Sequence, residues 1–178
     1  DRDLAQPFRT LAHNGEINTL KGNINWMKIH EQDMSSSLFK NVKNLQPVIR
    51  STSDSGALDN VFELLVHSGK LAPLIKLMMI PDAWSKRSKT VPKNHQDLFN
   101  FLNSTIEPWD GPAAICATDA KWVLASSDRN GLRPLRYTIT SDNLFFAGSE
   151  TGMIKIPEEN IIEKGKLGPG QIIAIDLK

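Results

Sequence analysis

The chain has 178 residues, of which 40% are hydrophobic and 23% charged, and its formal net charge is +1. This length supports a single well-buried core, and the near-zero charge argues against a nucleic-acid-binding surface or an acidic tail. No apolar run approaches the roughly 20 residues that a membrane helix needs, so the sequence predicts neither nucleic acid nor membrane as a partner.

The first half of the chain has the pattern of one short strand followed by helices. Residues 11–16 indicate a strand that runs into an Asn-Gly turn, where positive φ angles are readily supplied. Downstream, apolar residues recur every three or four positions, as on one face of a helix, and Gly69 is suited to end one of these helices. Four helices are expected. Three of them span residues 18–33, 73–79 and 96–106, and the other starts within residues 51–55 and ends at Gly69.

Between the third and fourth expected helices, residues 85–95 are rich in basic side chains and show little periodicity. The basic residues are Lys86, Arg87, Lys89 and Lys93. Either a basic binding loop or a solvated connector fits this composition, and the connector is the more common outcome.

The second half changes to short apolar runs separated by turn signals, a pattern typical of an antiparallel meander. The expected strands are 113–117, 122–126, 136–139, 144–147 and, after the turn Gly168-Pro169-Gly170, 171–177. Helices grouped before strands predict an α+β fold rather than a parallel βαβ fold.

The two ends and the single cysteine give further expectations. The chain starts at Asp1 with no visible signal peptide and stops directly after an apolar run, so we expect both ends to have been cut from a longer polypeptide. Cys116 is the only cysteine, which rules out an internal disulfide and fits a reducing compartment. Its place in the middle of an apolar strand predicts an inert thiol rather than a nucleophile, and no metal-ligand spacing is present.

Chemistry is suggested first by His13-Asn14-Gly15. An exposed backbone N–H beside an Asn amide provides two donors that can converge on one oxygen, as an oxyanion hole requires. Gly15 would also let the backbone approach a substrate closely. A plain turn remains the simpler interpretation of Asn-Gly alone.

Two further polar motifs each have two readings. Asp54, within Ser53-Asp54-Ser55, is placed either to cap the following helix or, if turned towards a cleft, to bind a substrate ammonium. The stretch from Asp128 to Pro134 either closes a hairpin or forms a structured loop near an anionic ligand or a neighbouring domain. In both cases the structural reading is the simpler one.

Taken in order, the motifs closely resemble the class II glutamine amidotransferase domain of glutamate synthases. The resemblance covers nearly the whole chain, and its order along the sequence makes it specific. The matching segments are 6–19, 22–27, 53–55, 107–113, 128–134, 149–152 and 164–170.

This resemblance implies a four-layer αββα fold of the N-terminal-nucleophile type, with antiparallel sheets. A cysteine at the mature N-terminus would attack the glutamine side chain, with its own α-amino group as base. By resemblance, Asn14 and the N–H of Gly15 form the oxyanion hole, and Asp54 binds the α-ammonium of glutamine. Asp1 stands at the N-terminus instead of that cysteine, and the arginine for the substrate carboxylate is expected upstream. Residues 1–178 are therefore expected to be one partial domain, truncated at both ends and inactive alone.

The resemblance also implies what lies outside this domain. Flavin mononucleotide (FMN) and an iron–sulfur cluster are expected in the rest of the enzyme, and no cofactor or metal in this domain. The expected partners are glutamine, the synthase domains of the same polypeptide, and a small subunit or ferredoxin, in the cytoplasm or plastid stroma. Two alternatives stay open: an amidotransferase of the same class with another ammonia acceptor, and a catalytically dead glutamine-binding module.

Overall fold

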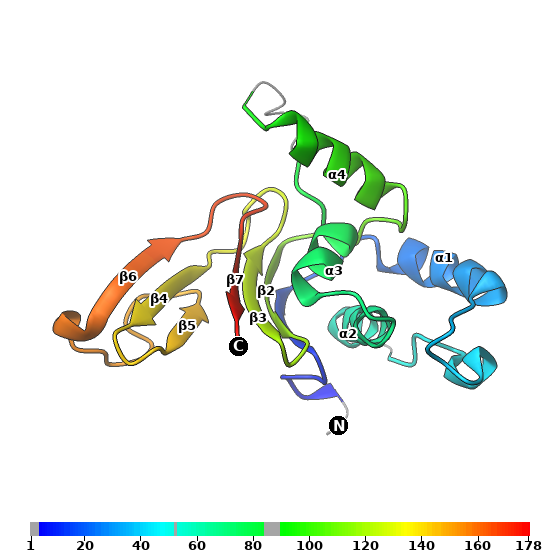
Figure 1. Ribbon diagram of the computed structural model, residues 1–178, viewed down its shortest axis with the longest axis horizontal. Helices are drawn as coiled ribbons and strands as arrows, with labels where there is room; N and C mark the ends of the chain where they lie inside the picture. Colours follow the sequence, from blue (N-terminus) through cyan, green and yellow to red (C-terminus); the bar gives the residue numbers. More distant parts are fainter. Residues whose placement is uncertain (1–3, 52, 84–89) are drawn as a thin grey trace.

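The computed structural model describes residues 4–51, 53–83 and 90–178. Its elements form successive layers, with helices at one side, a first sheet in the middle and a second sheet at the far end (Figure 1). Lys86, Arg87 and Lys89 of the expected basic segment lie outside the described residues.

The first sheet contains four antiparallel strands in the order β1-β2-β3-β7. These strands are β1 (Leu11–Gly15), β2 (Ala113–Thr118), β3 (Trp122–Ser127) and β7 (Ile172–Asp176). In the register of β1 and β2, Asn14 lies opposite Ala114 and Gly15 opposite Ala113. Because β1 is an edge strand, every second backbone N–H of β1 points away from the sheet.

The helices have sequence signals that explain most of their bounds. They are α1 (Leu20–Asp33), α2 (Asp54–His67), α3 (Ala72–Met79) and α4 (Lys93–Asn103), and the 3₁₀ helices are η2 (Val42–Leu45) and η4 (Glu158–Asn160). Ser53 is the N-cap of α2, and its side chain accepts a hydrogen bond from Gly56 N at 3.0 Å. Gly69 follows the end of α2 with φ +90°, as expected of a residue that ends a helix.

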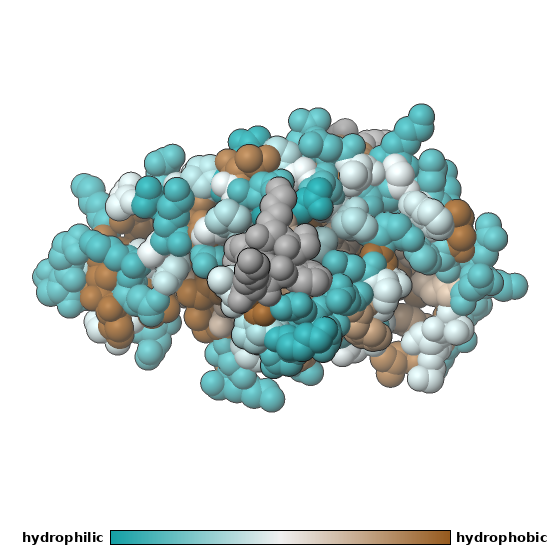
Figure 2. Space-filling model, turned by 90° about the horizontal axis from the view of Figure 1, so that it is seen from above, coloured by the Kyte–Doolittle hydropathy of each residue, from teal (hydrophilic) through white to brown (hydrophobic). Residues whose placement is uncertain are grey.

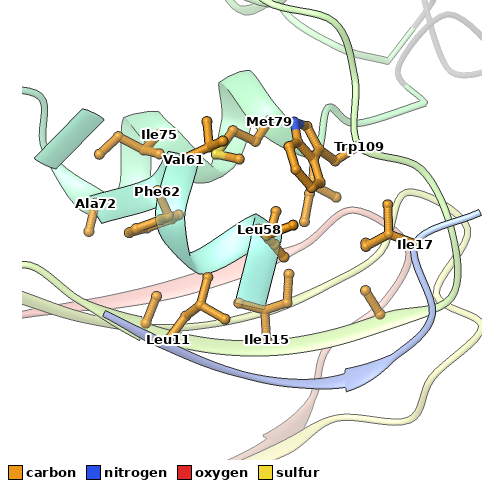
Figure 3. Close-up of a cluster of buried hydrophobic side chains, with 14 of the residues drawn as sticks. Leu11, Ile17, Leu58, Val61, Phe62, Ala72, Ile75, Met79, Trp109 and Ile115 are labelled. Carbon is orange, nitrogen blue, oxygen red and sulfur yellow. The ribbon is translucent and has the colours of Figure 1, made fainter. Parts of the chain in front are cut away.

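The main core lies between the helices and the first sheet. Figure 3 shows Leu58, Val61 and Phe62 of α2 directed among side chains of α3 and of the sheet, with Leu11 and Ile115 on the strands below. All five are at most 3% exposed. Burying one such large side chain contributes roughly 1.5–3 kcal/mol, so this contact fixes α2, and with it the start of α2, against β1.

The second sheet, of order β5-β4-β6, packs against the opposite face of the first. Its strands are β4 (Arg136–Thr140), β5 (Phe145–Gly148) and β6 (Ile161–Lys166). A smaller core of Ala125, Leu135 and Leu167 lies between the sheets, and Cys116 and Tyr137 pack against it. The α+β class with antiparallel sheets is confirmed, and the described residues supply one helical layer and both sheets of the expected four layers.

Four expectations about elements were wrong. Asn14 and Gly15 belong to strand β1 and do not form a turn with positive φ angles. The strands do not form one meander, because the chain crosses from the first sheet to the second between β3 and β4. Strand β6 was not expected. Helix α4 covers residues 93–103 rather than 96–106, since the Ser104 and Thr105 hydroxyls donate to the carbonyls of Phe101 and Leu102 and end it.

Candidate functional site

The end of β1 presents Asn14 and Gly15 at an open edge of the first sheet. Asn14 is exposed, and its cross-strand partner Ala114 packs towards the second sheet, so the Asn14 side chain lies on that face. Glu16 N donates to Pro112 O at 2.9 Å, which in the alternating pattern of the ladder leaves the N–H of Gly15 pointing away from β2. Two donors of successive residues are thus available at one edge.

No other residue fits at position 15. A Cβ there would lie 1.9 Å from the carbonyl oxygen of Pro112 and 2.8 Å from Nε2 of His13. These contacts are far inside van der Waals distance, and the first involves backbone that cannot move away cheaply. Gly15 is therefore required by packing, a different reason from the close approach to a substrate that its position suggested.

Asp54 lies at the first position of α2, and Ser53 rather than Asp54 caps the helix. The Asp54 carboxylate accepts from Ile17 N at 2.9 Å and from Ser55 N at 2.7 Å. The expectation that Asp54 is the helix cap was therefore wrong, because its side chain turns towards the segment that follows β1. The Asp54 carboxylate is thus bonded to a backbone N–H two residues after Gly15, at the end of β1 where Asn14 and Gly15 also lie.

Behind this edge, His13 connects β1 to α2. Its Nδ1 is hydrogen-bonded to Ser55 Oγ at 2.8 Å, and the residue is 4% exposed. Its Nε2 is buried without a hydrogen-bond partner in the described part of the chain. Burial lowers the pKa of His13, while the nearby Asp54 carboxylate acts to raise it and Arg133 to lower it further. The imidazole is therefore neutral at neutral pH.

Asp128 organises the loop that leaves the same end of the sheet. Its buried carboxylate accepts from four backbone N–H groups, those of Ala113, Asn130, Leu132 and Arg133. Burial acts to raise the pKa of Asp128, but these hydrogen bonds outweigh it and the pKa is lowered. The stretch 128–134 is thus a structured crossing between the sheets and not a hairpin. Next to Asp128, Arg129 forms an ion pair with Asp110.

Comparison with known proteins decides the family. The description "Glutamine amidotransferases class-II" matches residues 1–178. The chain belongs to this family. It is 58% identical over 98% of its length to the glutamate synthase (NADPH) large chain of Azospirillum brasilense and 45% identical over 98% to a ferredoxin-dependent glutamate synthase of Antithamnion sp.. It is 43% identical over 99% to the glutamate synthase (NADPH) large chain of Bacillus subtilis, and it spans 12% of each of these relatives.

The amidotransferase chain also buries a lysine beside the loop that Asp128 organises. Lys76 of α3 is 1% exposed, and its Nζ donates to Gly170 O at 3.3 Å. Burial lowers the pKa of Lys76 to about 8, although the Asp82 and Asp128 carboxylates act to raise it. A Cβ on Gly170 would lie 2.8 Å from the Asp82 carboxylate. The turn before β7 is thus fitted closely to this cluster of charges.

The buried Lys76 predicts a pH-dependent stability. Its pKa is about 8 in the folded chain and has an ordinary value of 10.5, so between these pH values the unfolded chain binds more protons. The free energy of unfolding should therefore rise as the pH increases from 8 to 10.5, with a contribution on the order of 3 kcal/mol. Urea unfolding of wild type and of Lys76→Met at stepped pH gives the free energy of unfolding as a function of pH for each. The contribution of Lys76 is the difference between the two proteins in how much this free energy rises from pH 8 to 10.5.

The exposed Lys121 offers a matched control for that experiment. Lys121→Met removes the same charge from the turn between β2 and β3 and should keep the wild-type slope. A Lys76→Met variant whose unfolding free energy rises as steeply as that of wild type between pH 8 and 10.5 would contradict the assignment.

Several residues of the site escaped the sequence analysis of this amidotransferase. His13 was noted only as part of its motif, and its bond to Ser55 joins residues 42 positions apart. Lys76 likewise bonds to Gly170, 94 positions away, whereas Asp128 binds three backbone N–H groups within five residues and that of Ala113, 15 positions away. The one available signal was Lys76 itself, a charge inside the apolar run 71–80.

A hollow of about 540 Å³ lies elsewhere, on the second sheet of the amidotransferase. Residues of β4, β5, β6 and the segment 150–156 line it, and its lining does not include Asn14, Gly15 or Asp54. Figure 2 shows hydrophobic side chains among hydrophilic ones at this end of the molecule. The large hydrophobic residues exposed there are Leu144, Met153, Ile154 and Ile162.

Cofactor ligands and membrane helices can be assessed over residues 4–51, 53–83 and 90–178. Within these ranges, no three His, Cys, Asp or Glu side chains are grouped so as to hold a metal ion. Nor does any helix there combine the length and apolar character that spanning a bilayer requires.

Proposed function

We propose that this chain forms part of the glutaminase site of a glutamate synthase, which hydrolyses glutamine to glutamate and ammonia. The observation that supports this most strongly is the hydrogen bond from Ile17 N to the Asp54 carboxylate, which places that carboxylate beside the end of β1 where Asn14 and Gly15 lie. In this proposal the chain is a partial domain of a longer polypeptide, called below the complete enzyme, whose upstream part provides a cysteine nucleophile and an arginine for the substrate carboxylate.

The chemistry assigned to the described residues is charge stabilisation and substrate binding. Attack of the cysteine sulfur on the glutamine amide carbon forms a C–S bond and places negative charge on the amide oxygen. Asn14 Nδ2 and Gly15 N–H donate hydrogen bonds to that oxygen. Collapse breaks the C–N bond, and the proton that the α-amino group took from the thiol passes to the leaving nitrogen, which departs as ammonia. The thioester that remains is hydrolysed by water to glutamate and free thiol. The Asp54 carboxylate holds the α-ammonium group throughout.

The fate of the ammonia belongs to other parts of the complete enzyme. We propose that it is channelled to 2-oxoglutarate at a distant site, where FMN and an iron–sulfur cluster supply electrons for reduction to a second glutamate. A small subunit or ferredoxin would deliver those electrons. A reducing compartment, cytoplasm or plastid stroma, fits the single unpaired cysteine.

Cys116 is not the nucleophile in this proposal. It lies in the middle of β2, packs against the core between the sheets, and its pKa is raised by burial, which disfavours the thiolate. We expect Cys116→Ser to leave the rate of ammonia release by the complete enzyme unchanged within twofold, measured with a coupled ammonia assay. Loss of ammonia release in a variant that still folds would show that Cys116 does participate.

The proposed function is tested by incubating the complete enzyme with glutamine and measuring ammonia and glutamate. We expect equal amounts of both products without 2-oxoglutarate, and additional glutamate when 2-oxoglutarate and a reductant are present. Binding of glutamine without hydrolysis would favour the glutamine-binding module, and ammonia transfer only to a sugar phosphate would favour another amidotransferase.

A further inference from the structure

Two hydrogen bonds enclose the Asn14-Gly15 dipeptide. On one side His13 Nδ1 is bonded to Ser55 Oγ at 2.8 Å, and on the other Ile17 N donates to Asp54 Oδ2 at 2.9 Å. Both partners are consecutive residues in the first turn of α2. The two proposed oxyanion-hole donors, Asn14 Nδ2 and Gly15 N–H, therefore lie between two hydrogen bonds that tie this segment to α2. The same helix carries Asp54, the proposed partner of the substrate ammonium.

The first attachment is buried and closely fitted. His13 is 4% exposed and Ser55 9% exposed, so little water competes for their hydrogen bond. Nε2 of His13 lies in the space that a side chain at position 15 would occupy. The imidazole thus packs directly against the backbone of Gly15 and limits where its N–H can lie.

Ser55 also connects to the second attachment. Its Oγ lies 3.3 Å from Asp54 Oδ1, to which it donates a weak hydrogen bond, while Asp54 keeps shorter bonds from Ile17 N and Ser55 N. Removal of the Ser55 hydroxyl would therefore remove the hydrogen bond to His13 Nδ1 but leave Asp54 held by two backbone donors.

We propose that His13 and Ser55 are positioning residues that hold the Asn14-Gly15 oxyanion hole in register with Asp54. This inference rests on the proposed function of that site. Neither side chain touches the substrate in this proposal, and both act through the placement of the two donors. An error on the order of 1 Å in such a placement can cost about 10²-fold in rate.

Ser55→Ala in the complete enzyme tests the proposal, because it deletes one hydroxyl and adds no bulk. We expect kcat for glutamine hydrolysis to fall roughly 10-fold or more and KM for glutamine to change less than about twofold. Ser68→Ala is the matched control, since Ser68 Oγ donates to Leu65 O at 2.7 Å at the far end of the same helix. That variant should keep the wild-type kcat.

A double-mutant cycle with Asn14→Ala shows whether Ser55 acts through the oxyanion hole. If it does, Ser55→Ala should cost much less in the Asn14→Ala background than in wild type. A Ser55→Ala enzyme that is less stable but has the wild-type kcat would overturn the proposal. So would a double variant whose loss in kcat equals the product of the losses of the two single variants. Failure of the proposed function would be recognised separately, as an Asn14→Ala enzyme with unchanged kcat.

Discussion

Replacing Asn14 with alanine in the complete enzyme should lower kcat for glutamine hydrolysis on the order of 10²–10³-fold, the usual cost of losing one oxyanion-hole donor. KM for glutamine should change little, because the donor acts when negative charge develops on the amide oxygen and not in the ground state. The N–H of Gly15 cannot compensate, since its direction is fixed by the edge of the sheet. Steady-state kinetics with glutamine measures both constants.

The control for this experiment is Asn44→Ala, which removes an exposed amide from η2. It should leave kcat and KM at the wild-type values. If Asn14→Ala also had the wild-type kcat, the assignment of Asn14 to the oxyanion hole would be wrong.

The second large effect is expected for Asp54→Asn. An asparagine keeps one acceptor oxygen, so one of the two backbone hydrogen bonds from Ile17 N and Ser55 N is lost and the melting temperature should fall slightly. In addition, the substrate ammonium loses its counter-ion. A lost charge-assisted hydrogen bond is worth roughly 1.5–3 kcal/mol, or about 10- to 150-fold in affinity. KM for glutamine should rise accordingly, while the reaction with added ammonia is spared because it bypasses this pocket.

Asp59 in the same helix provides a contrast for Asp54. Its buried carboxylate accepts from Thr10 N, Thr10 Oγ1 and Leu11 N and contacts no proposed substrate atom. Asp59→Ala removes the oxygen that accepts all three hydrogen bonds, so it should lower the melting temperature and leave KM for glutamine unchanged. An Asp54→Asn enzyme that behaved in this way, melting early but binding glutamine normally, would show that Asp54 has only a structural role.

The sequence predicted the elements in which apolar residues recur at regular intervals, such as every three or four positions in a helix. Helix α2 illustrates this, because Leu58, Val61 and Phe62 form a regular buried stripe and Gly69 marks its end. Strand β6 could not be recognised, since Ile161–Lys166 is mostly exposed, is charged and contains Gly165. Its strand character comes from pairing with β4, a tertiary contact that leaves no local pattern.

The candidate site divides in a similar way. Asn14, Gly15 and Asp54 stand in recognisable motifs, but the sequence indicated neither that Ser53 rather than Asp54 caps α2 nor that Asp54 binds Ile17 N. These details depend on how α2 docks on β1, which the packing of the main core decides. The bond between His13 and Ser55 has the same origin, because neither residue predicts the other from the sequence.

The central claim is that the open edge formed by Asn14, Gly15 and Asp54 binds glutamine for hydrolysis. A crystal structure of the complete enzyme with the product glutamate tests it most directly. The account predicts the α-ammonium within hydrogen-bond distance of the Asp54 carboxylate, and a side-chain carboxylate oxygen facing Asn14 Nδ2 and Gly15 N–H. Glutamate bound elsewhere, for example in the hollow on β4, β5 and β6, with the Asp54 edge empty, would contradict it.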